Sequence, residues 1–149
     1  MNGSGKFLGA DALRAATFVR LVDLHDTLPS TNDRAIELAA IREFETPAIV
    51  VTRLQTAGRG RGTNKWWSGE GALTFSLILD TDQWGVAQRD WPRLSLTTAV
   101  ALCDALSAVM PPTSLANKWP NDVLLDGAKV AGILIESPAI AEQAKDRLV

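Results

Sequence analysis

AIVVTRLQTAGRGRGTNKWWSGEGALTFSLIL, residues 48–79, joins two apolar segments through a glycine-rich basic loop. The first segment, 48–54, is rich in β-branched residues and predicts a strand that is buried on both faces. The second, 72–79, predicts the next strand. Because both ends of the loop join buried strands, the loop is a candidate site carried on a rigid scaffold.

The sequence before this unit predicts a strand and then a helix. Residues 18–24 alternate between apolar and polar, which is the pattern of a half-buried strand. Ser30 and Asp33 form a capping signature, in which an N-cap oxygen is followed three residues later by an acid. We expect the helix that begins there to carry Phe44 on its apolar face and to end at Pro47.

The sequence after the loop predicts a long helix and then a hairpin. Apolar residues recur at helical spacing over 92–110, and a pair of prolines follows. A strand is predicted from residue 115 to a turn at Pro120, and Asp126-Gly127 between apolar segments is a hairpin signal. A hairpin beside crossover helices predicts an α+β fold, with a mixed, largely antiparallel central sheet flanked by helices.

Composition limits the class of protein. The 149 residues are 46% hydrophobic, enough for one ordinary core, so we expect one soluble domain. A formal net charge of −2 argues against nucleic acid or a membrane surface as a partner. The single cysteine, Cys103, excludes an intrachain disulfide, is expected to be buried and suits a reducing compartment. No segment is apolar enough to span a bilayer, so we predict a cytoplasmic protein.

The loop contains the groups that a nucleotide needs. Alternate glycines let the backbone approach a ligand, and Arg59 and Arg61 supply fixed cations. Trp66 and Trp67 supply flat faces for a ring. A solvated basic loop and an arginine-glycine nucleic-acid segment are the alternative interpretations. Only two Arg-Gly steps occur and strong strands bracket the loop, so phosphate or nucleotide binding is favoured.

A second group of candidate residues is Lys118-Trp-Pro-Asn-Asp122, in which a rigid proline holds a cation and an amide at the end of an apolar strand. These residues are also good turn formers, and an exposed lysine needs no special explanation. A lysine held in this way would neutralise charge that develops at a carboxylate or an α-phosphate during nucleotidyl transfer.

Five ordered motifs resemble the biotin protein ligases, a family with the class II synthetase-like fold that also includes the lipoate ligases. They are Ser30-Thr31-Asn32, Gln55-Thr-Ala-Gly-Arg-Gly-Arg61, Lys65-Trp66-Trp67-Ser68, Lys118-Trp-Pro-Asn-Asp122 and Lys129-Val-Ala-Gly-Ile-Leu-Ile-Glu136. The sequence GRGRG followed by KWWS favours biotin over lipoate. The resemblance makes residues 18–149 the expected catalytic domain, with residues 1–17 as an N-terminal extension.

The resemblance implies a two-step ligase reaction that uses ATP and Mg²⁺. The biotin carboxylate attacks the α-phosphate of ATP to give biotinyl-5′-AMP and pyrophosphate. A lysine amine of a biotin carboxyl carrier protein domain then attacks the mixed anhydride. Aligning the reactants and neutralising charge lower the barrier, so the protein needs no nucleophile or acid-base pair.

The same resemblance implies the roles of individual residues. Lys118 and Arg61 are expected to be catalytic, with Lys118 bridging the biotin carboxylate and the phosphate. Asp122 is a candidate ligand of Mg²⁺. The expected biotin-binding residues are Ser30, Thr31, Asn32, Gln55, Gly58, Arg59, Trp66, Gly132 and Ile133. The expected nucleotide-binding residues are Arg59, Arg61, Trp67, Lys118 and Asn121.

The sequence also departs from the family pattern. Gly62-Thr63-Asn64 stand where the usual loop has a further glycine and a basic residue, so we expect weaker adenylate binding. The chain ends at Val149, where another strand is expected, so the C-terminal part of the catalytic sheet is expected to be missing. An open sheet edge favours self-association, for example as a homodimer. The alternative functions are a biotin- or nucleotide-binding module that cannot complete transfer and a lipoate-type ligase.

Overall fold

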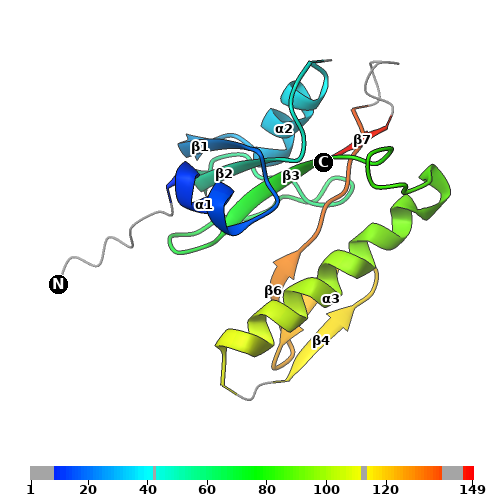
Figure 1. Cartoon of the computed structure of the whole chain (residues 1–149). Coiled ribbons are helices and arrows are strands. Elements are labelled where there is room, and N and C mark those ends of the chain that lie inside the picture. The colour runs from blue at the N-terminus through cyan, green and yellow to red at the C-terminus, as the bar shows by residue number, and fades with distance from the viewer. Residues whose placement is uncertain (1–8, 42, 112–113, 139–145) are drawn as a thin grey trace.

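The computed structural model describes residues 9–41, 43–111, 114–138 and 146–149 (Figure 1). Its elements are α1 (Ala10–Ala16), β1 (Leu21–Leu28), α2 (Thr31–Ala39), β2 (Ala48–Gln55), β3 (Thr74–Asp80), the 3₁₀ turn η1 (Gln88–Asp90), α3 (Trp91–Val109), β4 (Leu115–Lys118), β5 (Asp122–Leu125), β6 (Ala128–Gly132) and β7 (Arg147–Leu148). The expected α+β class is confirmed. Helix α1, which lies within the expected N-terminal extension, is next to β1 (Figure 1).

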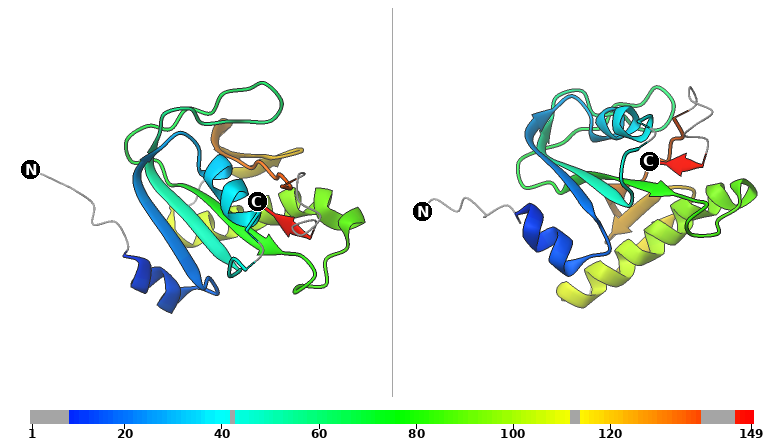
Figure 2. Two further views of the ribbon diagram at one scale, coloured as in Figure 1. Left: turned by 90° about the horizontal axis from the view of Figure 1, so that it is seen from above. Right: turned by 45° about the horizontal axis from the view of Figure 1, so that its top comes forward.

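The described strands form two sheets. One sheet has the order β1-β2-β3-β7, in which β1 and β2 are parallel and the other pairs are antiparallel. The second sheet, β4-β5-β6, is antiparallel throughout. Helix α2 covers one face of the larger sheet, and α3 and the smaller sheet lie on the opposite side (Figure 2). The mixed, largely antiparallel strands expected for the central sheet are thus divided between two sheets.

The core forms where α2 packs on the larger sheet. Buried side chains from α2, β2, β3 and the C-terminal residue make up its centre: Ala35, Leu38, Ala39, Ala48, Val50, Ile78 and Val149. Ser30 caps α2 as predicted, because its hydroxyl accepts a hydrogen bond from the Asp33 amide at 3.3 Å. Burial of one apolar face of α2, more than its intrinsic propensity, stabilises this short helix.

Helix α2 was predicted to continue to Pro47, but it ends at Ala39. The buried Arg147 side chain comes from β7 and donates hydrogen bonds to the carbonyls of Ala39 and Ile41, at 2.8 and 2.6 Å. A guanidinium that satisfies the carbonyls at a helix end makes a further turn unnecessary. Phe44 packs against the core from beyond the helix.

Strand β1 starts later than the predicted strand 18–24. Its register on β2 begins with Leu21 opposite Ala48 and ends with Leu28 opposite Gln55. Phe18 lies outside this register, and its ring contacts Trp84 edge-to-face with 5.5 Å between centroids. The bounds of β1 are therefore set by its pairing with β2. They are not set by the local alternation of apolar and polar residues.

Helix α3 and the hairpin agree with the prediction in position. The hairpin turn has positive φ at both Asp126 and Gly127, as its sequence requires. Ala99 is the one buried residue of α3, all of whose residues the structure describes. Cys103 is half-buried, contrary to the expectation of a buried thiol. None of the helices among the described residues is both long and apolar enough to cross a bilayer.

Candidate functional site

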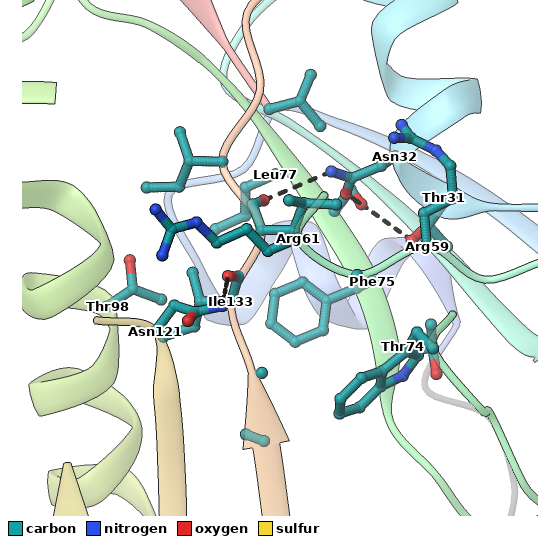
Figure 3. Close-up of a pocket in the computed structure, with 18 of the residues that line it drawn as sticks. Thr31, Asn32, Arg59, Arg61, Thr74, Phe75, Leu77, Thr98, Asn121 and Ile133 are labelled. Carbon is teal, nitrogen blue, oxygen red and sulfur yellow. Dashed lines mark hydrogen bonds between the residues drawn. The ribbon is translucent and has the colours of Figure 1, made fainter. Parts of the chain in front are cut away.

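A cavity of about 910 Å³ lies between the larger sheet and α3. Phe75, Leu77 and Leu79 alternate along β3 and line one side, while Ile78, on the other face of β3, belongs to the core. Figure 3 shows Phe75 of β3 and Thr98 of α3 on opposite sides of the cavity. The α3 side is a stripe at helical spacing: Leu94, Thr98, Leu102 and Leu106. These residues give the cavity an apolar middle.

One end of the cavity is polar and is built from the N-terminus of α2 and the end of β2. The amide and hydroxyl of Thr31 donate to Gln55 Oε1, at 2.7 and 3.1 Å. The Ser76 hydroxyl of β3 donates to Thr31 Oγ1 at 2.9 Å and also approaches Asn32 Oδ1. Ser30, Thr31 and Ser76 are buried. Four predicted biotin-binding residues, Ser30, Thr31, Asn32 and Gln55, thus line the cavity together.

The glycine-rich loop folds back on itself as a small antiparallel bridge. Arg59 and Lys65 are paired across it, and the Trp66 amide donates to the Gly58 carbonyl at 2.8 Å. The Gly60 amide also donates to the Asn64 carbonyl at 2.8 Å. The loop therefore has internal backbone order, in contrast to a flexible solvated loop.

Arg59 connects the loop to α2 and to the segment after β6. Its Nε donates to Asp33 Oδ1 at 2.7 Å. Its Nη1 and Nη2 donate to the two carboxylate oxygens of Glu136, at 2.8 and 2.6 Å. Asn32 Nδ2 donates to the same Glu136 carboxylate at 3.0 Å. Arg59 is thus held by protein carboxylates, whereas the sequence predicted a residue that binds biotin and phosphate.

The electrostatics of this cluster follow from the bidentate pair. The hydrogen bonds from Arg59 hold the pKa of the Glu136 carboxyl below its usual range, and Asn32 acts in the same direction. The Glu136 carboxylate in turn raises the pKa of Arg59. Both groups are therefore charged at neutral pH.

This lowered pKa predicts how stability depends on pH. A carboxylate whose folded-state pKa is below its unfolded value contributes stability above the unfolded value, about 4.3, and loses that contribution as pH falls through the folded value. The free energy of unfolding of wild type should therefore exceed that of Glu136→Gln by roughly 1 kcal/mol near pH 7, a modest figure because solvent screens the pair. The gap should close below about pH 4.

Urea unfolding of both proteins at several pH values measures this gap. The other carboxylates titrate in both proteins, so the difference isolates Glu136 in its setting of Arg59, Asp33 and Asn32. A gap that stays constant from pH 7 to pH 3 would contradict the proposed charge pairing.

The remaining predicted residues divide between the cavity and the surface. Arg61 lines the cavity and points across it (Figure 3), and its guanidinium has no hydrogen-bonding or ionic partner within the described part of the chain. Trp66, Gly132 and Ile133 also line the cavity. Asn121 lines it and is bound to Ile133, whose carbonyl accepts from Asn121 Nδ2 at 2.9 Å.

Three predicted residues lie elsewhere. Lys118 is exposed at the end of β4 and does not line the cavity. Trp67 is 85% exposed, with its ring over Gly69. Gly58 is a buried residue of the loop and does not line the large cavity. The sequence pattern identified the motifs of Lys118 and Trp67, but both side chains are exposed outside the cavity.

Lys129 was missed as a site residue, although its motif was recognised. It lies on β6 and lines the cavity, with Nζ 2.7 Å from Asp122 Oδ1 and 5.3 Å from the centroid of the Trp66 ring. The sequence contained a signal for Lys129. The Asp-Gly turn fixes the register of the hairpin, and the register decides which face of the hairpin the lysine side chain occupies. Ser76 had a similar signal, as a polar residue within an apolar strand.

The Asp122 carboxylate is committed to Lys129 by this contact. Within the described residues, no three His, Cys, Asp or Glu side chains cluster closely enough to hold a metal ion. The role of Asp122 as a Mg²⁺ ligand stays a prediction.

The sequence profile of the Biotin/lipoate A/B protein ligase family matches residues 24–145, which include the polar end, the loop and both β5 and β6. The chain belongs to this family. The match is independent of the cavity geometry, and it agrees with the resemblance on which the site residues were predicted.

Two curated relatives are bacterial biotin ligases. The chain is 45% identical over 109 residues to the biotin–[acetyl-CoA-carboxylase] ligase of Paracoccus denitrificans, covering 72% of this chain and 43% of the relative. It is 38% identical over 127 residues to the bifunctional ligase/repressor BirA of Bacillus subtilis, covering 84% of this chain and 37% of the relative. The chain therefore spans less than half the length of these two relatives.

Solved structures support the same fold. The biotin protein ligase of Leishmania major in complex with biotin has a TM-score of 0.69 and 28% identity, covering 85% of this chain and 53% of that one. The biotin protein ligase of Aquifex aeolicus in complex with biotin and ATP has a TM-score of 0.63 and 28% identity, covering 87% of this chain and 49% of that one. The α+β arrangement found in this chain is thus that of biotin protein ligases.

Proposed function

We propose that this chain carries the biotin- and ATP-binding part of a cytoplasmic biotin protein ligase, which makes biotinyl-5′-AMP and transfers biotin to a lysine of a biotin carboxyl carrier protein. The observation that carries the proposal is the cavity, which has a hydrogen-bonding end, an apolar middle and cationic side chains on its wall. The chain also aligns with the Aquifex aeolicus ligase in complex with biotin and ATP. Biotin has the same succession of a polar ring, an apolar chain and a carboxylate.

In this proposal the polar end binds the ureido group of biotin. Thr31, Asn32 and Gln55 offer hydroxyl and amide groups, and Ser30 and Ser76 complete the set. Trp66, Gly132 and Ile133 contact the ring and the alkyl chain, with the β3 and α3 residues opposite. A mostly apolar pocket with a few convergent polar groups is typical of small-molecule sites.

The first chemical step joins the biotin carboxylate to the α-phosphorus of ATP as pyrophosphate leaves. Of the cationic residues on the cavity wall, Arg59 is bound to two carboxylates. Lys129 and Arg61 would neutralise the biotin carboxylate and the phosphate as these approach. In the second step, a carrier lysine amine attacks the biotinyl carbonyl carbon and AMP leaves. Binding both reactants in one cavity supplies the alignment that this chemistry needs.

Other residue roles remain proposals taken from the motifs. Lys118 is a candidate catalytic residue only if the β4 to β5 turn moves toward the cavity, and Trp67 would have to turn inward to stack on adenine. Asn121 would contact the nucleotide at the cavity wall. Gly58 and Arg59 would support biotin through the loop. Mg²⁺ would enter with ATP as part of the substrate.

Incubating the purified chain with biotin, MgATP and an apo carrier domain tests the proposal. We expect biotinyl-5′-AMP by mass spectrometry and biotinylated carrier by avidin blot. Biotin binding without either product would favour the alternative of a binding module, and activity with lipoate but not biotin would favour a lipoate-type ligase. No binding of biotin or ATP would overturn the proposal. Light scattering of the purified chain alone tests the homodimer expected from the sequence.

A further inference from the structure

Glu136 lies behind the cavity wall, yet its side chain contacts two residues that line the cavity. Its carboxylate accepts two hydrogen bonds from Arg59 and one from Asn32. Asn32 is at the beginning of α2, and Arg59 is in the glycine-rich loop. Glu136 therefore joins two separate walls of the cavity at one point.

The backbone of Glu136 is itself fixed. Its amide donates to the Val149 carbonyl at 2.8 Å, and the Val149 amide donates to the Glu136 carbonyl at 2.8 Å. Val149 is buried in the core with α2 and β3. The backbone that carries this carboxylate is thus anchored to the same core that supports α2.

The charges of this cluster indicate what Arg59 does. Three of its N–H groups are bound to two carboxylates, Asp33 and Glu136, so one cation faces two anions. A guanidinium has five such donors, so most are used before a ligand arrives. An incoming carboxylate or phosphate would meet a cluster with net negative charge. Arg61, which has no side-chain partner among the described residues, is the better anion-binding arginine.

We propose that Glu136 is a positioning residue, which fixes Arg59 and Asn32 so that the loop and the α2 N-terminus are preorganised around the ligand. Arg59 acts as the structural arginine of the loop, and Arg61 is left to bind the anion. The consequence for ligand binding rests on the function proposed above. The consequence for loop order does not.

Limited trypsin digestion measures loop order without any ligand. The loop has bonds for trypsin after Arg59, Arg61 and Lys65. In wild type we expect cleavage after Arg61 to be faster than cleavage after Arg59. In Glu136→Gln, cleavage after Arg59 should become about tenfold faster, because the charge-assisted bidentate hydrogen bonds that hold the Arg59 side chain are lost. Glu37→Gln is the matched control on the exposed side of α2, and it should leave the pattern unchanged.

Binding and kinetics test the positioning role. For Glu136→Gln we expect the biotin KM to rise about tenfold while kcat changes less than about twofold, as when ground-state and transition-state binding are lost together. Arg59→Gln should give a similar loss, and the double variant should be no worse than either single variant. Arg59→Lys keeps the positive charge but lacks the planar guanidinium that makes bidentate hydrogen bonds, so it should behave like Arg59→Gln.

The two arms separate failure of this proposal from failure of the proposed function. Equal cleavage after Arg59 in wild type and Glu136→Gln would overturn the positioning role. Additive effects of the two single variants on KM would also overturn it. If wild type does not bind biotin, the proposed function fails, and the cleavage comparison alone decides the role of Glu136. If circular dichroism shows that Glu136→Gln is unfolded, the cleavage and kinetic measurements are made on Arg59→Lys instead.

Discussion

Replacing Lys129 with alanine should reduce the rate of biotinyl-5′-AMP formation by about 10²–10³-fold, the usual cost of removing one preorganised charge-stabilising group. The biotin carboxylate and the α-phosphate are both anionic, and they must come together for the first step. Lys129 supplies an ammonium on the cavity wall, beside the Trp66 ring and the backbone of Gly132. Removing it leaves the repulsion between the reactants uncompensated.

The contacts around Lys129 place its ammonium where a ligand in the cavity can reach it. Asp122 Oδ1 holds the ammonium at 2.7 Å, and the side chain of Lys129 is 43% exposed, so a ligand can reach it. A Cβ atom at Gly132 would lie 3.2 Å from Lys129 Nζ, which shows how closely the β6 backbone and the ammonium approach. Little movement is needed before the ammonium meets a carboxylate in the cavity.

Lys118→Ala is the matched comparison for Lys129→Ala, because the sequence motif favours Lys118 and the cavity geometry favours Lys129. We expect adenylate formation by Lys118→Ala to stay within about threefold of wild type, as is usual for an exposed side chain outside the site. Quench-flow with radiolabelled ATP measures both rates. A large loss in Lys118→Ala with a small loss in Lys129→Ala would contradict this assignment and restore the role predicted from the motif.

The difference between Lys118 and Lys129 shows what the sequence can and cannot predict. Motifs identified Ser30, Thr31, Asn32 and Gln55, because capping chemistry and a strand end bring these residues to one place. The face of a short edge strand was not predictable in the same way. One residue of register turns a side chain to the opposite face of a sheet, and the lysine at the end of β4 is turned outward.

The bounds of helices and strands were not predictable from local sequence, because long-range contacts set them. The end of α2 depends on Arg147, which lies more than a hundred residues later in the sequence. Its side chain binds the carbonyl of Ala39, the last helical residue, and that of Ile41 just beyond it. The start of β1 depends on its pairing with β2. The bidentate bond between Arg59 and Glu136 likewise joins residues that no local pattern connects. The motifs indicated which residues matter, and tertiary pairing decides which of them meet.

Gly58→Ala should reduce biotin affinity by at least about 100-fold, since misplacement of a binding wall by about 1 Å has effects of this size. A Cβ atom at position 58 would lie 2.5 Å from the Trp66 carbonyl oxygen and 2.7 Å from Gln55 Nε2. The first neighbour is backbone and the second belongs to the polar end of the cavity. Relief of the clash must therefore separate the two sides of the loop or move Gln55.

Gly60→Ala provides the control within the same loop. Its Cβ atom would lie 3.3 Å from the Asn64 Cβ, a tight contact that a shift of a few tenths of an ångström relieves. We expect biotin affinity within about fivefold of wild type and a smaller loss of stability than in Gly58→Ala, for which overpacking predicts about 1–3 kcal/mol. Isothermal titration with biotin and urea unfolding measure the two quantities. If Gly58→Ala binds biotin as tightly as Gly60→Ala does, close contact between Gly58 and the Trp66 backbone is not what holds the wall of the cavity in place.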